Sequence, residues 1–219
     1  MNFDLVIFDC DGVVVDTETT ALTVLGHMIS EKNVPIENTN AFVEMHRGKK
    51  IASILDEVSK QYHIQFPENF IDEFRKRSFE TFKKEITPID GIEEVLKGLK
   101  VPFCMGSNSP LALIESCLAL TGLLHYFKGK IYSAYELNRW KPDPFLFQFA
   151  ADAMGVSHER CLVVEDSLCG VQAAVSAKMF PLGYVEGLGD DAKIKERSEI
   201  LQKEGATVIS DMRNVLNWV

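Results

Sequence analysis

The 219-residue chain has no long hydrophobic run and no repeated or low-complexity segment. Its apolar stretches are short and interrupted, so none is long enough to span a bilayer. The first residues, MNFDLVIFD, carry acids where a secretory signal has basic residues. We therefore expect a cytoplasmic protein that does not interact with a membrane.

The sequence also lacks closely spaced cysteine pairs and long clusters of positive charge. The five cysteines form no Cys-x-x-Cys pair, and an odd count of this kind indicates reduced, mostly buried thiols. The basic clusters RGKK at 47–50 and RKR at 75–77 are short, and the formal net charge is −9. These features argue against nucleic acid as a partner. They still allow a small anionic ligand, because a few cations and a metal can dominate one pocket.

Short apolar runs alternate with helix-like segments through most of the chain. The runs expected to form strands are 3–9, 101–107, 129–133, 161–166 and 180–185. The helices expected between and after them are 91–100, 109–122, 144–155, 167–179, 191–205 and 212–218. Such alternation predicts an α/β fold, a Rossmann-like parallel sheet covered by helices on both faces.

One long segment departs from this alternation. Residues 17–86 contain several helical patterns and no strand-like run, and TPIDG at 87–91 has the composition of a turn. The sequence therefore predicts an α/β core formed by residues 1–16 and 87–219. A helical domain, residues 17–86, is inserted after the first strand.

Chemically active residues are concentrated where predicted strands end. In an open α/β sheet, ligands bind beyond the carboxyl ends of the strands. The residues at or near these ends are Asp9, Asp11, Ser107, Asn108, Lys141, Glu165 and Asp166. A structural core does not need so many polar side chains at one edge: four acids, a hydroxyl, an amide and a lysine. Their concentration indicates a functional site.

Asp9 and Asp11 lie two residues apart, so they project from the same face while the strand continues. Two like charges this close favour an intervening cation, and Mg²⁺ prefers oxygen ligands. Gly12 allows a sharp turn and leaves room for a ligand. The alternative for a single acid here is that it caps a turn.

Ser109 is expected to cap the helix at 109–122, with Pro110 at its first position.

Four segments resemble, in order, the motifs of the haloacid dehalogenase superfamily: DCDGVVVDTE, GSNS, RWKPDP and VVEDSLCGVQAA. The helical insertion resembles the small cap of that superfamily. The subgroup with β-phosphoglucomutase and sugar-phosphate phosphatases is the most similar, and YSAYELNRWKPDP is similar to bacterial 6-phosphogluconate phosphatases. The resemblance spans nearly the whole chain.

The resemblance implies phosphoryl transfer. Asp9 would be the nucleophile that forms an aspartyl-phosphate, and Asp11 the general acid and then the base. Ser107 and the backbone around Asn108 would hold phosphate oxygens, and Lys141 would offset negative charge. Similar dehalogenases lack an acid at the position of Asp11, so its presence favours phosphoryl transfer over cleavage of a carbon–halogen bond.

The resemblance also implies a Mg²⁺ site. Asp166 would bind the ion together with the carboxylate of Asp9 and the backbone carbonyl of Asp11. Glu165 would act through a metal-bound water or from outside the ligand set.

The inserted domain is expected to supply specificity. Arg47, Gly48 and Lys49, in MHRGKK at 45–50, resemble the cap's substrate loop, where the cations would face a second anionic group such as a sugar acid. The alternative is a solvated helix end. His46 has no partner at ligand spacing and is expected to make a structural hydrogen bond.

The leading hypothesis is a Mg²⁺-dependent phosphatase that acts, as a monomer, on a small phosphorylated sugar or sugar acid. A phosphoglucomutase-like transferase would use the same acids and return the phosphoryl group to its substrate. A receiver-like signalling module would hold the phosphoryl group on Asp9, but such modules are about half this length. An inactive relative is the fourth alternative.

Overall fold

The computed structural model describes residues 3–46, 51–186 and 191–219. The chain forms two compact units. One contains residues 1–16 and 87–219, and the other contains residues 17–86. The expected substrate-loop residues Arg47, Gly48 and Lys49 lie outside the described residues.

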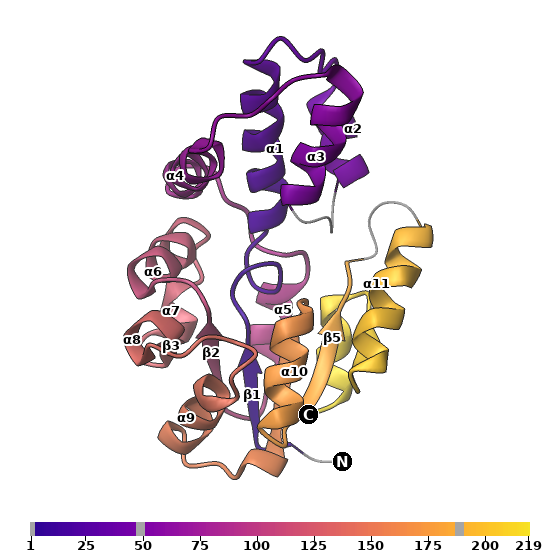
Figure 1. The fold of residues 1–219 in the computed structure, drawn as a ribbon. Helices are drawn as coiled ribbons and strands as arrows, with labels where there is room; N and C mark the ends of the chain where they lie inside the picture. Colours follow the sequence, from indigo (N-terminus) through magenta and orange to yellow (C-terminus); the bar gives the residue numbers. More distant parts are fainter. Residues whose placement is uncertain (1–2, 47–50, 187–190) are drawn as a thin grey trace. The chain divides into compact units, whose positions relative to one another are not determined.

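A six-stranded parallel sheet forms the centre of the first unit, in the order β3-β2-β1-β4-β5-β6 (Figure 1). The strands are β1 (Leu5–Phe8), β2 (Phe103–Ser107), β3 (Ile131–Ser133), β4 (Cys161–Glu165), β5 (Phe180–Tyr184) and β6 (Thr207–Ile209). The parallel α/β fold expected from the sequence is confirmed. The sixth strand was not predicted from the sequence.

Helical segments connect these strands and follow the last one. They are α5 (Ile92–Gly98), α6 (Leu111–Leu120), α7 (Leu124–Phe127), α8 (Ala134–Leu137), α9 (Phe145–Ala153), η1 (His158–Arg160), α10 (Leu168–Ser176), α11 (Asp191–Lys203) and η2 (Met212–Asn217). The last of these is a 3₁₀-helix, in place of the α-helix expected at 212–218.

Both faces of β1 are covered, which explains why LVIF is a continuous apolar run instead of an alternating one. On one face, Leu5 and Ile7 pack with residues of α9 and α10, including Phe147 and Ala173. On the other face, the ring of Phe8 makes edge contacts with the rings of Phe103 and Phe127. Each such buried side chain contributes about 1.5–3 kcal/mol relative to exposure, so the strand that carries Asp9 is firmly held.

The second unit contains α1 (Thr17–Ser30), α2 (Thr39–His46), α3 (Ile51–Tyr62) and α4 (Phe70–Phe82). One face of α3 is apolar: Ile54, Leu55 and Val58 are buried in this unit's own core, and Ile51 packs against it. Residues 17–86 therefore have a hydrophobic core that is separate from the sheet. Among the described residues, none of the helices has the length and apolarity needed to cross a membrane.

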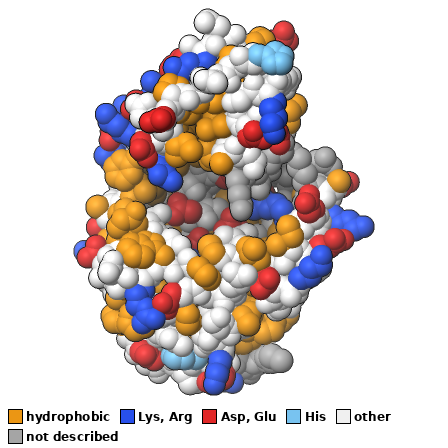
Figure 2. Space-filling model, in the orientation of Figure 1, with side chains coloured by type: hydrophobic (Ala, Val, Ile, Leu, Met, Phe, Trp, Pro, Cys, Tyr) orange, Lys and Arg blue, Asp and Glu red, His pale blue; other side chains and the backbone are white. Residues whose placement is uncertain are grey.

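Acidic and basic side chains are interspersed with hydrophobic ones on the face shown in Figure 2. The exposed large hydrophobic residues include Leu120 on α6 and Phe149 on α9. Apolar residues exposed singly among charged ones are normal for a globular surface.

Candidate active site

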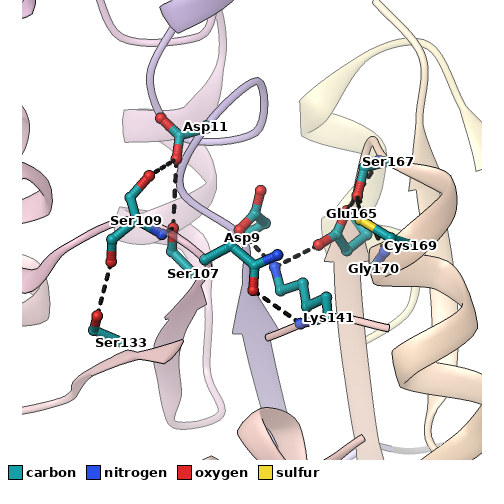
Figure 3. Close-up of polar contacts among 11 residues, drawn as sticks. Asp9, Asp11, Ser107, Ser109, Ser133, Lys141, Glu165, Ser167, Cys169 and Gly170 are labelled. Carbon is teal, nitrogen blue, oxygen red and sulfur yellow. Dashed lines mark hydrogen bonds and ion pairs between the residues drawn. The ribbon is translucent and has the colours of Figure 1, made fainter. Parts of the chain in front are cut away.

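The direction in which successive strands are added to the sheet changes at β1, which is the topological switch point of the fold. From β1 the chain continues through β2 and β3 on one side, and then through β4, β5 and β6 on the other. Because ligands of open α/β sheets bind at the carboxyl ends beside such a switch, the residues after β1, β2 and β4 are the candidates. These residues lie together in Figure 3.

Lys141 joins two carboxylates from different strands. Its Nζ lies 2.6 Å from Oδ1 of Asp9 and 2.5 Å from Oε1 of Glu165. Asp9 and Lys141 are each 7% exposed, and Glu165 is fully buried. Figure 3 shows the lysine side chain between the ends of β1 and β4. Two buried carboxylates therefore share one buried ammonium group, and the three side chains together carry more negative than positive charge.

The pKa values reflect this excess of negative charge. The pKa of Asp9 is raised to about 7: burial raises it most, Lys141 opposes this effect, and the charges of Glu165 and Asp11 add to it. Burial disfavours the charged form of Lys141, but the carboxylates of Asp9 and Glu165 outweigh it and hold the pKa of Lys141 above its ordinary value. A bound cation would favour the ionised form of Asp9, which is the form that can attack an electrophile.

Glu165 is fully engaged by neighbouring groups. While Oε1 accepts from Lys141, Oε2 accepts from the backbone N–H of Ser167 at 2.9 Å and from its hydroxyl at 2.8 Å. Helix α10 begins beside it, and a side chain at Gly170 would overlap the Glu165 carboxylate. Glu165 thus orients Lys141, and its contacts favour a place outside the direct ligands of a metal.

The acids fit a hard divalent cation. One carboxylate oxygen from each of Asp9, Glu165 and Asp166 lies within 4.8 Å of the other two. The lack of a side chain at Gly12 leaves room for the Asp166 carboxylate, because a Cβ at this position would lie 2.4 Å from Oδ2 of Asp166. Gly12 also has a positive φ of 76°, which favours glycine. Arg197 lies 3.8 Å from the same Asp166 oxygen. Oxygen donors with excess negative charge are the ligands that Mg²⁺ prefers.

Asp11 is held by two hydroxyl groups at the end of β2 and just after it. Its Oδ2 accepts from the hydroxyl of Ser109 at 2.6 Å and from that of Ser107 at 3.4 Å. Ser107 is fully buried, and its Oγ accepts from the backbone N–H of Ser109 at 3.0 Å. The expected helix-capping role of Ser109 is wrong: the N-cap of α6 is Pro110 and no side chain caps it.

Asn108 supports the position of Lys141. Its side-chain Oδ1 accepts a hydrogen bond from the backbone N–H of Lys141 at 2.9 Å. This contact ties the loop that carries the lysine to the end of β2. From the sequence, the backbone around Asn108 was expected to hold phosphate oxygens. The contact between its side chain and Lys141 was not predicted.

The structure brings together seven of the residues singled out from the sequence: Asp9, Asp11, Ser107, Asn108, Lys141, Glu165 and Asp166. The sequence missed Ser109 and Ser167, whose hydroxyl groups hold two of these acids. Both stand before helices, where a serine is ordinarily interpreted as a cap. Ser167 does cap α10, since its Oγ accepts from Gly170 N–H at 3.1 Å, and its hydroxyl also donates to Glu165.

Two other expectations concern residues outside this cluster. Cys10 is buried, and burial raises the pKa of its thiol above the usual value, as expected for an inert core cysteine. His46 is buried in the helical unit, where its ring lies 4.4 Å from that of Phe42 and its Nδ1 lies 4.0 Å from Glu57. The structural hydrogen bond expected for His46 stays a prediction.

Residues 3–178, which contain every residue of this cluster, match the family model of the haloacid dehalogenase-like hydrolases. The chain belongs to this family. As a member of it, the protein is a hydrolase, and the order of its motifs agrees with the resemblance seen in the sequence.

Individual relatives cover most of the chain. A 6-phosphogluconate phosphatase of Escherichia coli K12 is 32% identical over 179 residues, which are 81% of this chain and 80% of that protein. The fructose-1-phosphate phosphatase YqaB of the same organism is 31% identical over 79% of this chain and 92% of its own length. A crystal structure of a family hydrolase from Deinococcus radiodurans, with bound phosphate and sodium, has a TM-score of 0.80 and 28% identity, and the match covers 97% of this chain and 93% of that one.

Proposed function

We propose that this protein is a Mg²⁺-dependent phosphatase that hydrolyses a small phosphorylated sugar or sugar acid through an aspartyl-phosphate on Asp9. The observation that carries the proposal is the position of Asp9: it is buried, paired with Lys141, and close to Asp11, Glu165 and Asp166. The names of the relatives support a sugar-phosphate substrate, and 6-phosphogluconate is the first compound to test.

In the first step, a carboxylate oxygen of Asp9 forms a bond to phosphorus as the ester P–O bond breaks. The leaving oxygen keeps the electron pair of that bond and takes a proton from the carboxyl group of Asp11. Lys141 holds Oδ1 of Asp9 and thereby fixes the orientation of the nucleophile. Ser107 and the backbone around Asn108 would donate hydrogen bonds to the equatorial oxygens.

In the second step, Asp11 accepts a proton from water as the water oxygen bonds to phosphorus. The P–O bond to Asp9 breaks, inorganic phosphate is released and Asp9 returns to a carboxylate. Asp9, Asp166 and the backbone carbonyl of Asp11 would hold Mg²⁺, which supplies charge neutralisation for the phosphoryl group when it is bound. Lys141 would stabilise the same charge from the protein side.

Residues 17–86 would act as a cap that selects the substrate and limits the access of water. Arg47, Gly48 and Lys49 stay a prediction for the recognition of a carboxylate or second anionic group. A sugar acid phosphate would provide such a group, and Arg suits bidentate contact with it.

The experiment is a screen of the purified protein against phosphorylated metabolites, with and without Mg²⁺. It includes 6-phosphogluconate and hexose phosphates, and both inorganic phosphate and sugar products are measured. Phosphate release that requires Mg²⁺ supports the proposal. Isomerised sugar phosphate without phosphate release would identify a mutase instead, and a stable phosphoprotein without turnover would identify a receiver-like module.

A further inference from the structure

We propose that Ser109 is a positioning residue that orients Asp11 for proton transfer to the leaving group, an inference that rests on the proposed function. Its hydroxyl donates to Oδ2 of Asp11 at 2.6 Å. This distance is short for an O–H···O hydrogen bond, whereas the 3.4 Å between Ser107 Oγ and the same oxygen is long. Ser109 therefore makes the stronger of the two contacts.

Ser109 is itself held on three sides. Its backbone carbonyl accepts from the hydroxyl of Ser133 at 2.8 Å, and its N–H donates to Oγ of Ser107 at 3.0 Å. Pro110 follows directly and restricts the backbone of residue 109. These contacts fix the backbone of Ser109, and they thereby fix the position from which its hydroxyl reaches Asp11.

The contacts link three adjacent strand ends. Ser133 ends β3 and pairs in register with Ser107 at the end of β2, and Asp11 follows β1. Figure 3 shows the connected series from Ser133 through Ser109 to Asp11. These contacts attach the Asp11 carboxylate to the ends of two neighbouring strands as well as to its own turn.

This arrangement makes the two oxygens of Asp11 unequal. Because Oδ2 accepts hydroxyl protons, it is the oxygen that carries no proton when Asp11 is in the acid form. The proton given to the leaving oxygen then resides on Oδ1. Ser109 thus selects which oxygen performs the transfer, and its removal would allow the carboxyl group to rotate away from the substrate.

The test compares Ser109→Ala with the unchanged protein on two substrates, an alkyl phosphate and 4-nitrophenyl phosphate. An alkoxide leaves only with a proton, whereas 4-nitrophenolate leaves without one. Acid catalysis contributes about 10²–10⁴-fold, so we expect kcat/KM to fall about 10- to 100-fold on the alkyl phosphate and less than about 3-fold on the nitrophenyl ester. The comparison uses kcat/KM because it reports formation of the phosphoenzyme, before water is activated.

Further variants separate positioning from a structural role. Ser109→Thr keeps the hydroxyl and should restore most of the alkyl-phosphate activity. Ser109→Ala added to Asp11→Asn should cause no further loss beyond Asp11→Asn alone. Ser133→Ala, which leaves Ser109 itself intact, should lower the same kcat/KM to a smaller extent, and it provides the test if Ser109→Ala does not fold.

The outcomes distinguish this inference from the proposed function. Equal losses on both substrates, no loss on either, or failure of Ser109→Thr to restore activity would overturn the role of Ser109 while leaving a phosphatase. Absence of phosphate release by the unchanged protein from every substrate would instead refute the proposed function.

Discussion

Lys141 Nζ lies 2.6 Å from Oδ1 of Asp9, although 132 residues separate the two along the chain. The pair is buried, and Glu165 shares the same ammonium group. A contact of this kind between distant segments constrains both the fold and the chemistry, and several measurements can test it.

Replacing the lysine should affect stability as well as activity. Lys141→Met leaves Asp9 and Glu165 buried without their common cation, and loss of one partner from a buried ion pair costs about 3–5 kcal/mol. Urea denaturation at pH 7 measures this loss in the free energy of unfolding. Lys97→Met, at an exposed site on α5, is the matched control and should change stability little. A similar small change in Lys141→Met would contradict the buried-pair argument.

Asp9→Asn should abolish phosphate release, by at least about 10³-fold, because an amide is a far weaker nucleophile and a poorer metal ligand. The control is Asp4→Asn, at the other end of the same strand, where the carboxylate pairs with Arg160 on the surface. Circular dichroism verifies the fold of both variants. Substantial residual turnover in Asp9→Asn would mean that another residue is the nucleophile.

Asp11→Asn should separate the two steps of the reaction. Without a proton donor and acceptor at this position, the protein should either accumulate the phosphoenzyme or fail to form it. Rapid acid quenching followed by mass spectrometry detects phosphate on Asp9. Normal turnover by this variant would remove Asp11 from the acid–base role.

Mg²⁺ should stabilise the fold even without substrate. A ligand that binds only the native state at 100 times its Kd adds about 2.7 kcal/mol to the free energy of unfolding. A melting experiment with Mg²⁺ and then with excess chelator measures this effect. Asp166→Asn should reduce the response, while Asp152→Asn, an exposed acid on α9, should retain it. An unchanged response in Asp166→Asn would place the ion elsewhere.

A surface network gives a pH-dependent prediction that is independent of catalysis. Arg213 lies 3.0 Å from Asp90 and from Glu94, and its hydrogen bond lowers the pKa of Asp90. Because the native pKa is below the unfolded one, this stabilisation is present above the unfolded pKa and is lost as pH falls through the native value.

Arg213→Gln should therefore lower the melting temperature most near pH 7 and progressively less under acid conditions below the ordinary aspartate pKa of about 3.9. Thermal melts at several pH values measure the difference from the unchanged protein. Lys100→Gln removes the same charge at an exposed position and serves as the control. A difference that grows as the pH falls would contradict the assigned ion pair.

The main strands and the acids at their ends could be predicted from the sequence, because a strand buried on both faces is uniformly apolar until it reaches the site. VIFD at 6–9 and VVED at 163–166 show this transition directly. The parallel sheet then requires their ends to meet at one edge. Strand β6 was missed, although β3 is equally short, also lies at an edge of the sheet and was predicted, so neither length nor edge position explains the difference.

The contacts within the site were harder to foresee. Ser109 precedes a proline and a helix, so local rules predict a cap, whereas its hydroxyl contacts an acid 98 positions away. Likewise, nothing local indicates that the side chain of Asn108 fixes the backbone of Lys141. Such pairs are decided by tertiary packing, which brings together segments that have no pattern in common.

The segment that leaves the sheet after β1 also returns beside its own point of departure. Asp16 N–H donates to the carbonyl of Thr87 at 2.9 Å, and Val15 forms an antiparallel bridge with Pro88. Residues 17–86 are thus attached like a module with adjacent ends. Under the proposed function, exchange of this insertion for another would leave β1 and the residues at its end in place, so the range of accepted compounds could diverge while the reacting groups stay the same.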